Sequence, residues 1–460
     1  MKSITLTGTG LSHEQVVAVA YGASVVLDPL QLPKVAATAE FLAEQVTQQQ
    51  PLYGISTGFG SNADKLLGAH PIRDSRRSGE TLLQELQRNL IITHAVCVGE
   101  PFAPEVVRAM MVIRINTLMR GHSGIRVETL QALTALLNAG VVPVVPKLGS
   151  VGASGDLAPL SHLAIVLLGG GEAFFDGGRL SGADALAKAG LEPIVLSHKE
   201  GLALNNGTAQ MLATGVLAVA KLEELCDTAD LAAAMTLDAF AGRMRAFDDH
   251  VHALRPHPGQ VHAAKHLQQF LAGSKLTDIA YHLVPRFKSW LPRCWPDASL
   301  DALNFDIAWD WVPLSQRHGR EKFYQRFKPF RGGKKHQPQD SYSLRCIPQV
   351  HGAVRDAVAQ ARRVLEIELN AVTDNPLIFP GLEGARNIED QIVSAGHFHG
   401  MPLAIALDGL RVAACHIGGI SERRVYWVLS GHDVHNPVTP YLAEDPGLQS
   451  GLMIAQYTAA

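Results

Sequence analysis

Apolar residues recur at the spacing of amphipathic helices along most of the chain, which predicts a mainly α-helical protein. Shorter helices are expected early in the chain, at about 12–20, 80–96, 104–119 and 130–138. Long stretches rich in alanine, leucine and glutamate predict later helices at 208–246, 350–372 and 404–421. Helices of ~20 to 40 residues are roughly 30 to 60 Å long, more than one compact domain needs. The expected fold class is an elongated helical bundle with a smaller mixed N-terminal domain, and the long helices indicate oligomerisation.

Glycine and proline interrupt the helical pattern mainly in the first part of the chain. Val141–Pro146 should be extended, and the glycines at 169–171 and 177–178, on either side of Ala173–Phe175, predict a small hairpin. We therefore divide the chain into an N-terminal domain, 1–207, and a central helical domain, 208–460. A segment at about 280–333, which holds four of the five tryptophans and a basic, aromatic run, is interpreted as an insertion. The alternative is a nucleic-acid or partner surface, although a basic cluster alone is a weak signal.

Composition limits the kinds of partner that the protein can bind and the cellular compartment in which we expect it. The net charge is only -3 over 460 residues, which gives no attraction toward nucleic acid or an anionic membrane. Five scattered cysteines without a CxxC pair indicate neither a disulfide framework nor a zinc site. The N-terminus has no apolar signal core, and no later apolar run approaches about 20 residues. We expect a cytoplasmic protein that acts on a small molecule and binds neither nucleic acid nor membrane.

The segment Gly149–Gly155 contains the most specific chemistry, because Ala153, Ser154 and Gly155 can react with one another. In a tight turn, the Gly155 nitrogen can attack the Ala153 carbonyl, since glycine has no Cβ to shield its amide and tolerates strained dihedrals. Loss of two waters, one including the Ser154 hydroxyl, leaves a five-membered ring with an exposed methylidene. The product is an electrophile, which protein side chains otherwise lack.

A glycine- and serine-rich stretch is more commonly an ordinary turn before a helix. Ser154 or Asp156 would then be the N-cap of a helix through 160–168. An anion-binding loop is a further alternative, but the segment lacks the Lys-Ser/Thr of a phosphate loop and the glycine spacing of a dinucleotide fingerprint. It is also not a Gly-x-Ser-x-Gly nucleophile elbow. Whether this segment is an ordinary turn or a self-reacting tripeptide therefore depends on the other motifs in the chain.

Those motifs resemble the histidine and aromatic amino acid ammonia-lyase family. Besides Ala153–Gly155 inside the sequence GSVGASGDLAPL, they occur in the family's order over nearly the whole chain, at 53–60, 201–208, 342–346, 370–376, 398–399, 421–424 and 450–456. The resemblance implies a mainly helical homotetramer whose active sites combine more than one subunit. It also implies the cofactor 4-methylidene-imidazol-5-one (MIO), formed from Ala153, Ser154 and Gly155, with no external cofactor and no metal. The implied reaction is elimination of ammonia from an amino acid.

The same resemblance assigns roles to single residues. Tyr53 matches the catalytic tyrosine of the first loop, a base whose phenol, with an ordinary pKa near 10, needs a polar or cationic setting. Tyr342 matches the second catalytic tyrosine, on a mobile loop that closes over the site. Arg345 would hold the substrate carboxylate in a two-pronged charge-assisted pair. Three further positions match substrate-facing residues: Asn206 bonds the ring or carboxylate, Gln339 is a polar support and Phe398 is a pocket wall.

Thr93 and His94 occupy the family's selectivity position. At this position, histidine-specific members of the family have a small polar residue followed by His, whereas tyrosine-specific members have His-Leu and phenylalanine-specific members have Phe-Leu. The pattern therefore favours histidine, with urocanate and ammonia as products, because a second imidazole can hydrogen-bond an imidazole substrate. A lyase or aminomutase acting on tyrosine or phenylalanine is the first alternative. The alternative for His94 is that it is an ordinary helix histidine with no role in substrate selection.

Three departures from the family pattern support a second alternative, a catalytically impaired family member. Family members usually continue beyond the point matching Ala460, and that part adds an acidic or amide residue facing the substrate. The insertion precedes the Tyr342 loop, and His397 replaces the usual asparagine before Phe398.

His262 and His266 have the i,i+4 spacing of metal ligands, but no Cys or acidic partner is apparent in sequence, which favours a polar surface helix.

Overall fold

The computed structural model describes residues 3–48, 50–60, 63, 80–240, 242–274, 277, 339–430 and 439–460. These residues form two compact units, each described on its own. Unit 1 comprises 1–220 and 360–408, and unit 2 comprises 221–359 and 409–460. The predicted domain division at residue 207 stays a prediction. The predicted insertion at about 280–333 lies outside the described residues.

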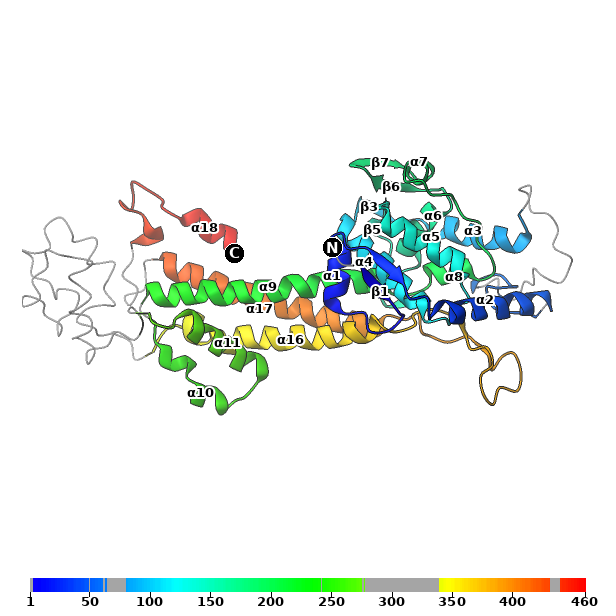
Figure 1. Ribbon diagram of the computed structural model, residues 1–460. Coiled ribbons are helices and arrows are strands. Elements are labelled where there is room, and N and C mark those ends of the chain that lie inside the picture. The colour runs from blue at the N-terminus through cyan, green and yellow to red at the C-terminus, as the bar shows by residue number, and fades with distance from the viewer. Residues whose placement is uncertain are drawn as a thin grey trace, which may run out of the picture. The chain divides into compact units, whose positions relative to one another are not determined.

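Unit 1 combines helices with four small sheets (Figure 1). Strand β1 pairs in parallel with β2, whereas β3–β5, β4–β6–β7 and β8–β9 are antiparallel. The hairpin predicted around Ala173–Phe175 is confirmed as β6 and β7. The elements are β1 (Ile4–Leu6), α1 (His13–Ala20), β2 (Val25–Leu27), α2 (Leu32–Thr47), α3 (Leu82–His94), β3 (Val98–Pro101), α4 (Pro104–Met119), α5 (Val127–Asn138), β4 (Val142–Pro143), β5 (Pro146–Leu148), α6 (Leu157–Leu167), β6 (Glu172–Phe175), β7 (Gly178–Ser181), α7 (Gly182–Lys188), α8 (Glu200–Asn205), β8 (Leu377–Ile378) and β9 (Ile392–Val393).

Helix α4 forms the centre of unit 1. Every residue from Ala109 to Met119 is buried, and the helix packs against both α1 and α5. Local sequence signals fix where the neighbouring helices begin. Ser12 forms a capping box with Gln15 at the start of α1, and Thr81 does the same with Gln84 at the start of α3, which satisfies backbone donors that have no partner inside a helix.

Three long helices contribute to both units: α9 (Ala209–Ala239), α16 (Ile347–Glu368) and α17 (Met401–Ser430). In unit 1, a side chain on Gly215 of α9 would lie 3.1 Å from Leu365 of α16 and 3.0 Å from Leu407 of α17, so the three helices touch there. These helices confirm the predicted mainly α-helical bundle. Helix α9 ends earlier than the predicted residue 246, because the N–H of Gly242 folds back onto the Leu237 carbonyl at 2.6 Å.

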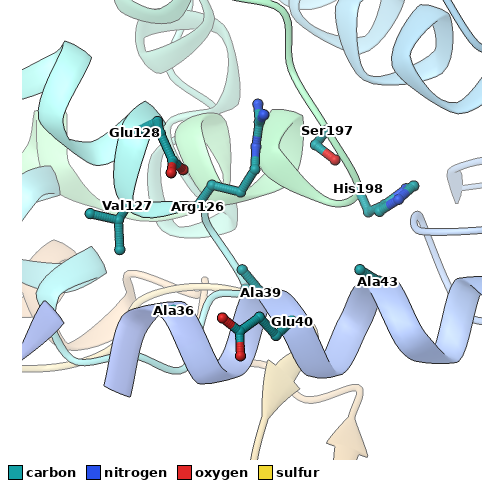
Figure 2. A pocket seen from close by; sticks show the side chains of 10 residues that line it. Ala36, Ala39, Glu40, Ala43, Arg126, Val127, Glu128, Ser197 and His198 are labelled. Atoms are coloured by element: carbon teal, nitrogen blue, oxygen red, sulfur yellow. The ribbon is translucent and has the colours of Figure 1, made fainter. Parts of the chain in front are cut away.

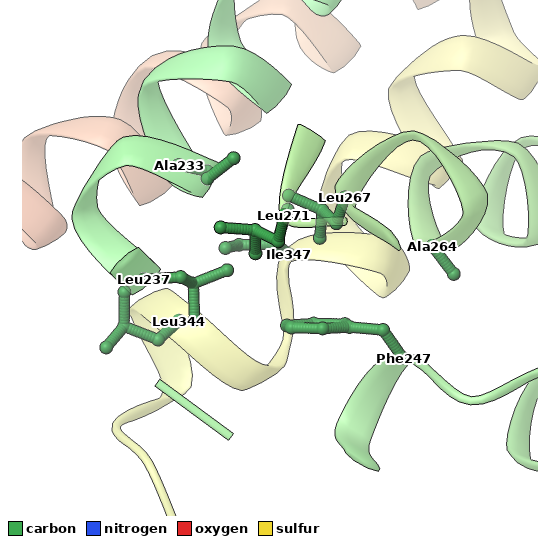
Figure 3. Close-up of a cluster of buried hydrophobic side chains, with 9 residues drawn as sticks. Ala233, Leu237, Phe247, Ala264, Leu267, Leu271, Leu344 and Ile347 are labelled. Atoms are coloured by element: carbon green, nitrogen blue, oxygen red, sulfur yellow. The ribbon is translucent and has the colours of Figure 1, made fainter. Parts of the chain in front are cut away.

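Unit 2 has its own hydrophobic core (Figure 3). Phe247 and Leu237 are fully buried in it, together with Leu344 and Ile347. The remaining members of this cluster are Ala233, Ala234, Ala264, Leu267 and Leu271. The shorter elements of unit 2 are η3 (Met244–Phe247), α10 (Asp249–Ala253), α11 (Pro258–Phe270), α15 (Tyr342–Arg345), η8 (Pro440–Leu442) and α18 (Met453–Ala459).

Helix α17 differs from the sequence expectation that no apolar run approaches membrane length. By length and composition it could cross a membrane, and only 17% of its most apolar window is buried. Large apolar side chains, among them Ile405 and Val412, are exposed on it. Asp408 and Arg411 interrupt the apolar sequence, and charged residues are costly in a bilayer centre. A single helix of this kind is weak support for membrane insertion, and its exposed face needs another explanation.

The unit 2 core yields a stability prediction. Replacing Leu237 by alanine should lower the free energy of unfolding by about 2–5 kcal/mol, because a fully buried leucine leaves both lost transfer energy and a cavity. Leu254→Ala is the matched control, since Leu254 is 88% exposed and should change stability by less than about 0.5 kcal/mol. Urea unfolding midpoints of the two variants check this, and equal midpoints would contradict the packing described for the cluster.

Candidate active site

The segment around Ala153 is bent tightly at the tripeptide Ala153–Gly155. Gly152–Ser154 forms a 3-10 turn, and the Gly155 N–H donates to the Gly152 carbonyl at 2.9 Å. Gly155 has a φ of 107°, in a region that residues with a Cβ rarely adopt. A Cβ there would also lie 3.3 Å from the Phe398 carbonyl oxygen. Ser154, which would supply the leaving hydroxyl, is exposed.

Two other segments hold this turn through backbone hydrogen bonds. The Ala153 carbonyl accepts from the Gly400 N–H at 2.8 Å, and the Asp156 N–H donates to the Gly207 carbonyl at 2.8 Å. Phe398 and Asn206, both predicted as substrate-facing residues, lie in these two segments. The structure therefore brings Phe398, Asn206 and Ala153–Gly155 together within unit 1.

Asp156 is buried directly after the turn, but its carboxylate does not cap α6 as the simple turn interpretation required. Instead, its two oxygens accept hydrogen bonds from Ser150 Oγ at 2.7 Å and from the Met211 N–H at 2.9 Å. Met211 lies in the first turn of α9, so Asp156 caps a helix that is distant in sequence. Burial raises the pKa of Asp156 to about 6 and outweighs the opposite effect of these donors.

Tyr53 lies in a loop that packs closely on α8. Gly54 has a φ of 63°, and a Cβ at Gly54 would be 2.6 Å from Leu202 Cδ1. Gln87 joins the two segments: its Nε2 donates to the Gly54 carbonyl at 3.2 Å, and its Oε1 accepts from the Gly201 N–H at 3.0 Å. The Tyr53 hydroxyl accepts from the Gly60 N–H at 3.2 Å. The Tyr53 loop is thereby fixed to α8, the helix that ends directly before Asn206.

A buried charged cluster lies behind Asn206, and sequence reasoning missed it. The Arg114 guanidinium is fully buried and donates to the carbonyls of Ala203 and Thr373, each at 2.8 Å. Lys199 and Asp374 form an ion pair at 2.7 Å with both side chains fully buried. The sequence signal for this cluster was Arg114, a charged residue within the apolar run that forms α4.

Asn206 itself is bound to the segment that this cluster holds. Its Nδ2 donates to the Asn375 carbonyl at 3.2 Å, and the Asn375 N–H donates to the Asp374 carboxylate at 2.7 Å. The 370–376 motif therefore positions Asn206. Gly207 cannot be larger, because a Cβ there would lie 2.5 Å from the Thr373 carbonyl oxygen.

Thr93 and His94 close helix α3. The Thr93 hydroxyl donates to the Asn89 carbonyl at 2.7 Å, and His94 Nδ1 lies 2.9 Å from the Leu90 carbonyl oxygen. A proton on Nδ1 satisfies that carbonyl and leaves Nε2 as an acceptor. His94 can therefore be both an ordinary helix histidine and a selectivity residue. Its contact with the backbone carbonyl favours the tautomer in which Nε2 accepts a hydrogen bond from a donor on the substrate.

The remaining predicted site residues belong to unit 2. Tyr342 begins α15 and is 71% exposed, and the Arg345 guanidinium lies 4.6 Å above its ring. Arg345 Nε also donates to the Asp340 carbonyl at 3.0 Å. Leu344, between the two residues, is buried in the unit 2 core and anchors this turn. Gln339 is exposed next to it.

The histidine pair of α11 has an acidic neighbour that sequence spacing did not reveal. Asp227 of α9 offers a carboxylate oxygen within 4.8 Å of ligand atoms of His262 and His266. The Arg355 guanidinium lies 2.7 Å from Asp227 and 2.5 Å from Asp230. Arg355 thus already supplies positive charge to these carboxylates. The absence of a metal site stays a prediction.

A separate pocket of about 280 Å³ opens beside α2 in unit 1 (Figure 2). Ala36, Ala39, Glu40 and Ala43 of α2 form one wall, and Arg126 and His198 lie opposite. Arg126 is engaged by the buried carboxylate of Glu200 at 2.7 Å. None of the predicted site residues lines this pocket, so it is distinct from the segment around Ala153.

Comparisons with known proteins define the class. The model of the aromatic amino acid lyase family matches residues 11–460, and the chain belongs to that family. It is accordingly a carbon–nitrogen lyase. Histidine ammonia-lyase from Symbiobacterium thermophilum is 42% identical over 100% of this chain and 76% of its own length, and that from Gloeobacter violaceus is 44% identical over 99% and 75%.

Solved structures agree with this assignment. The crystal structure of histidine ammonia-lyase from Trypanosoma cruzi is 33% identical, with a TM-score of 0.75, over 100% of this chain and 73% of that one. The tyrosine aminomutase from Streptomyces globisporus is also 33% identical, with a TM-score of 0.80, over 100% and 77%. The fold is therefore shared by relatives with lyase and aminomutase names.

The raised pKa of Asp156 predicts a pH dependence of stability. The folded state binds this proton more tightly than the unfolded state, whose pKa is near 3.8. Stability should therefore fall as the pH rises from 3.8 to about 6, by on the order of 2–3 kcal/mol, and then level off. Asp156→Asn should remove that fall, whereas Asp176→Asn, an exposed control, should retain it. Urea midpoints at pH 4 and 7 test this, and an unchanged slope in Asp156→Asn would refute it.

Proposed function

We propose that this chain is a histidine ammonia-lyase that converts L-histidine to trans-urocanate and ammonia. The observation that carries the proposal is the geometry of Ala153–Gly155: a tight turn, a glycine at positive φ and an exposed serine. The residues fit the MIO group, because no side chain shields the Gly155 nitrogen and Ser154 can lose its hydroxyl. When formed, the group would supply an electrophilic carbon for the substrate amine, which would make the nitrogen a better leaving group.

The chain's own residues would bind the substrate and move its protons. Tyr53 is the proposed base for the β-proton, with Tyr342 as the second tyrosine. Arg345 would bind the carboxylate through two parallel N–H donors. Asn206, Gln339 and Phe398 would complete the pocket. Asn206 is the best supported, because buried partners hold it beside the turn.

Histidine is the proposed substrate because of His94 and because of the names of the relatives at 40–44% identity. An aminomutase or a lyase acting on tyrosine or phenylalanine is the second candidate, favoured by the structural similarity to the tyrosine aminomutase. We also propose a cytoplasmic homotetramer. The exposed apolar side chains of α17, including Ile405 and Val412, are then covered by other copies, which removes the need for a membrane.

Intact mass and turnover test the electrophile together. The purified chain should be lighter than its sequence by two water molecules and should form urocanate from histidine. Ser154→Ala should abolish both the mass loss and the activity, whereas Ser181→Ala, at an exposed serine that ends β7, should retain both. A wild-type mass equal to that of the unmodified chain would overturn the proposal. Coumarate or cinnamate formed in place of urocanate would establish the second candidate.

His94 provides the test of substrate choice. His94→Leu should lower kcat/KM for histidine about 10- to 100-fold, because a polar group of the substrate would lose its partner at a cost of roughly 1–3 kcal/mol. The mass loss of two waters should persist, since His94 takes no part in it. Ile92→Ala, on an exposed position of the same helix, is the control and should leave kcat/KM nearly unchanged. An equal kcat/KM in His94→Leu would remove His94 from the pocket.

A further inference from the structure

The hydrogen bond from the Gly400 N–H to the Ala153 carbonyl lies at the reacting atoms of the proposed ring closure. The N···O distance is 2.8 Å. Gly400 immediately precedes α17, and its own carbonyl accepts the first bond of that helix, from the Ala404 N–H at 2.9 Å. Donors at a helix N-terminus lack partners within the helix and carry partial positive charge. The Ala153 oxygen is thus polarised by the start of a 30-residue helix.

Ring closure places negative charge on that same oxygen. The Gly155 nitrogen bonds to the Ala153 carbonyl carbon, and the electrons of the C=O bond move onto oxygen. This oxygen then leaves as water with the protons of the Gly155 and Ser154 nitrogens, which creates the C=N bond of the ring. A second water takes the Ser154 hydroxyl and its Cα hydrogen and leaves the methylidene. No oxidant or external reactant is needed.

We propose that the Gly400 backbone N–H is a catalytic group for this maturation, an oxyanion donor that stabilises the charge developing on the Ala153 oxygen. The proposal rests on the proposed function, because it concerns formation of the MIO group. It assigns to a residue outside the reacting tripeptide the task that oxyanion-hole donors perform in acyl transfer.

Packing fixes the donor in place. Gly400 is buried, and a Cβ on it would lie 3.1 Å from both Met211 Sδ and Thr208 Cγ2 at the start of α9. The Met211 N–H is also bound by Asp156, directly after the turn. The donor and the turn are therefore held by the same end of α9, and little reorganisation accompanies ring closure, as a preorganised electrostatic group requires.

Gly400→Pro and Gly400→Ala form a matched pair for the test. Both add a Cβ against Met211 and Thr208, but only proline removes the N–H, and proline is tolerated at the start of a helix. Each chain is synthesised in a cell-free system and sampled over time for intact mass. We expect Gly400→Ala to lose two waters at close to the wild-type rate and Gly400→Pro to be roughly 100- to 1,000-fold slower, the usual effect of one oxyanion donor. Equal rates in the two variants would overturn the proposal.

A second pair covers the case in which Gly400→Pro does not fold. His399 is exposed beside the donor, so His399→Glu and the neutral His399→Gln should both fold. The added negative charge should slow loss of the two waters about two- to fivefold relative to His399→Gln, the range of helix-terminus charge effects. Equal rates in this pair would then overturn the proposal. Wild-type chain that never loses two waters would instead defeat the proposed function, so the two failures are distinguishable.

Discussion

The region around the reactive turn depends on the burial of three charges, those of Arg114, Lys199 and Asp374. Removing such groups from water is costly, and the cost is tolerable only where each finds partners. Arg114 therefore binds the carbonyls of Ala203 and Thr373, and Lys199 binds the Asp374 carboxylate at 2.7 Å. These contacts join α4, α8 and the 373–375 segment. The position of Asn206 and of the Gly207 carbonyl follows from them.

The turn itself is held mainly by backbone atoms. Gly207 accepts from the Asp156 N–H, and Gly400 donates to the Ala153 carbonyl, each at 2.8 Å. Backbone contacts leave little room for side chains, which explains why glycine stands at 155 and 207, where a Cβ would lie 3.3 Å from the Phe398 carbonyl oxygen and 2.5 Å from the Thr373 carbonyl oxygen. A reaction between neighbouring peptide units needs this close approach, and the surrounding fold enforces it.

The sequence predicted the long helices of the bundle, because periodicity is a local property, but it did not predict α2. It also predicted Asn206, Phe398 and the Ala153–Gly155 turn through motifs, and the structure brings these together. It could not predict that Asp156 caps α9, because the partner lies 55 positions away. Likewise, the neighbour of His262 and His266 comes from another helix, and Arg114 was one charge within an apolar run. What sequence reasoning missed consists of long-range polar contacts, which leave no periodic pattern.

The N-termini of two long helices, α9 and α17, contact the reactive turn or the residue directly after it. The start of α9 receives the Asp156 carboxylate, whereas the start of α17 directs the Gly400 N–H to the neutral Ala153 carbonyl. A helix N-terminus attracts negative charge, so the first end is satisfied by a charge already present. The second end has only a neutral carbonyl, and its interaction strengthens as that oxygen becomes negative. This difference favours the transition state of ring closure over the starting turn, which is the condition for catalysis.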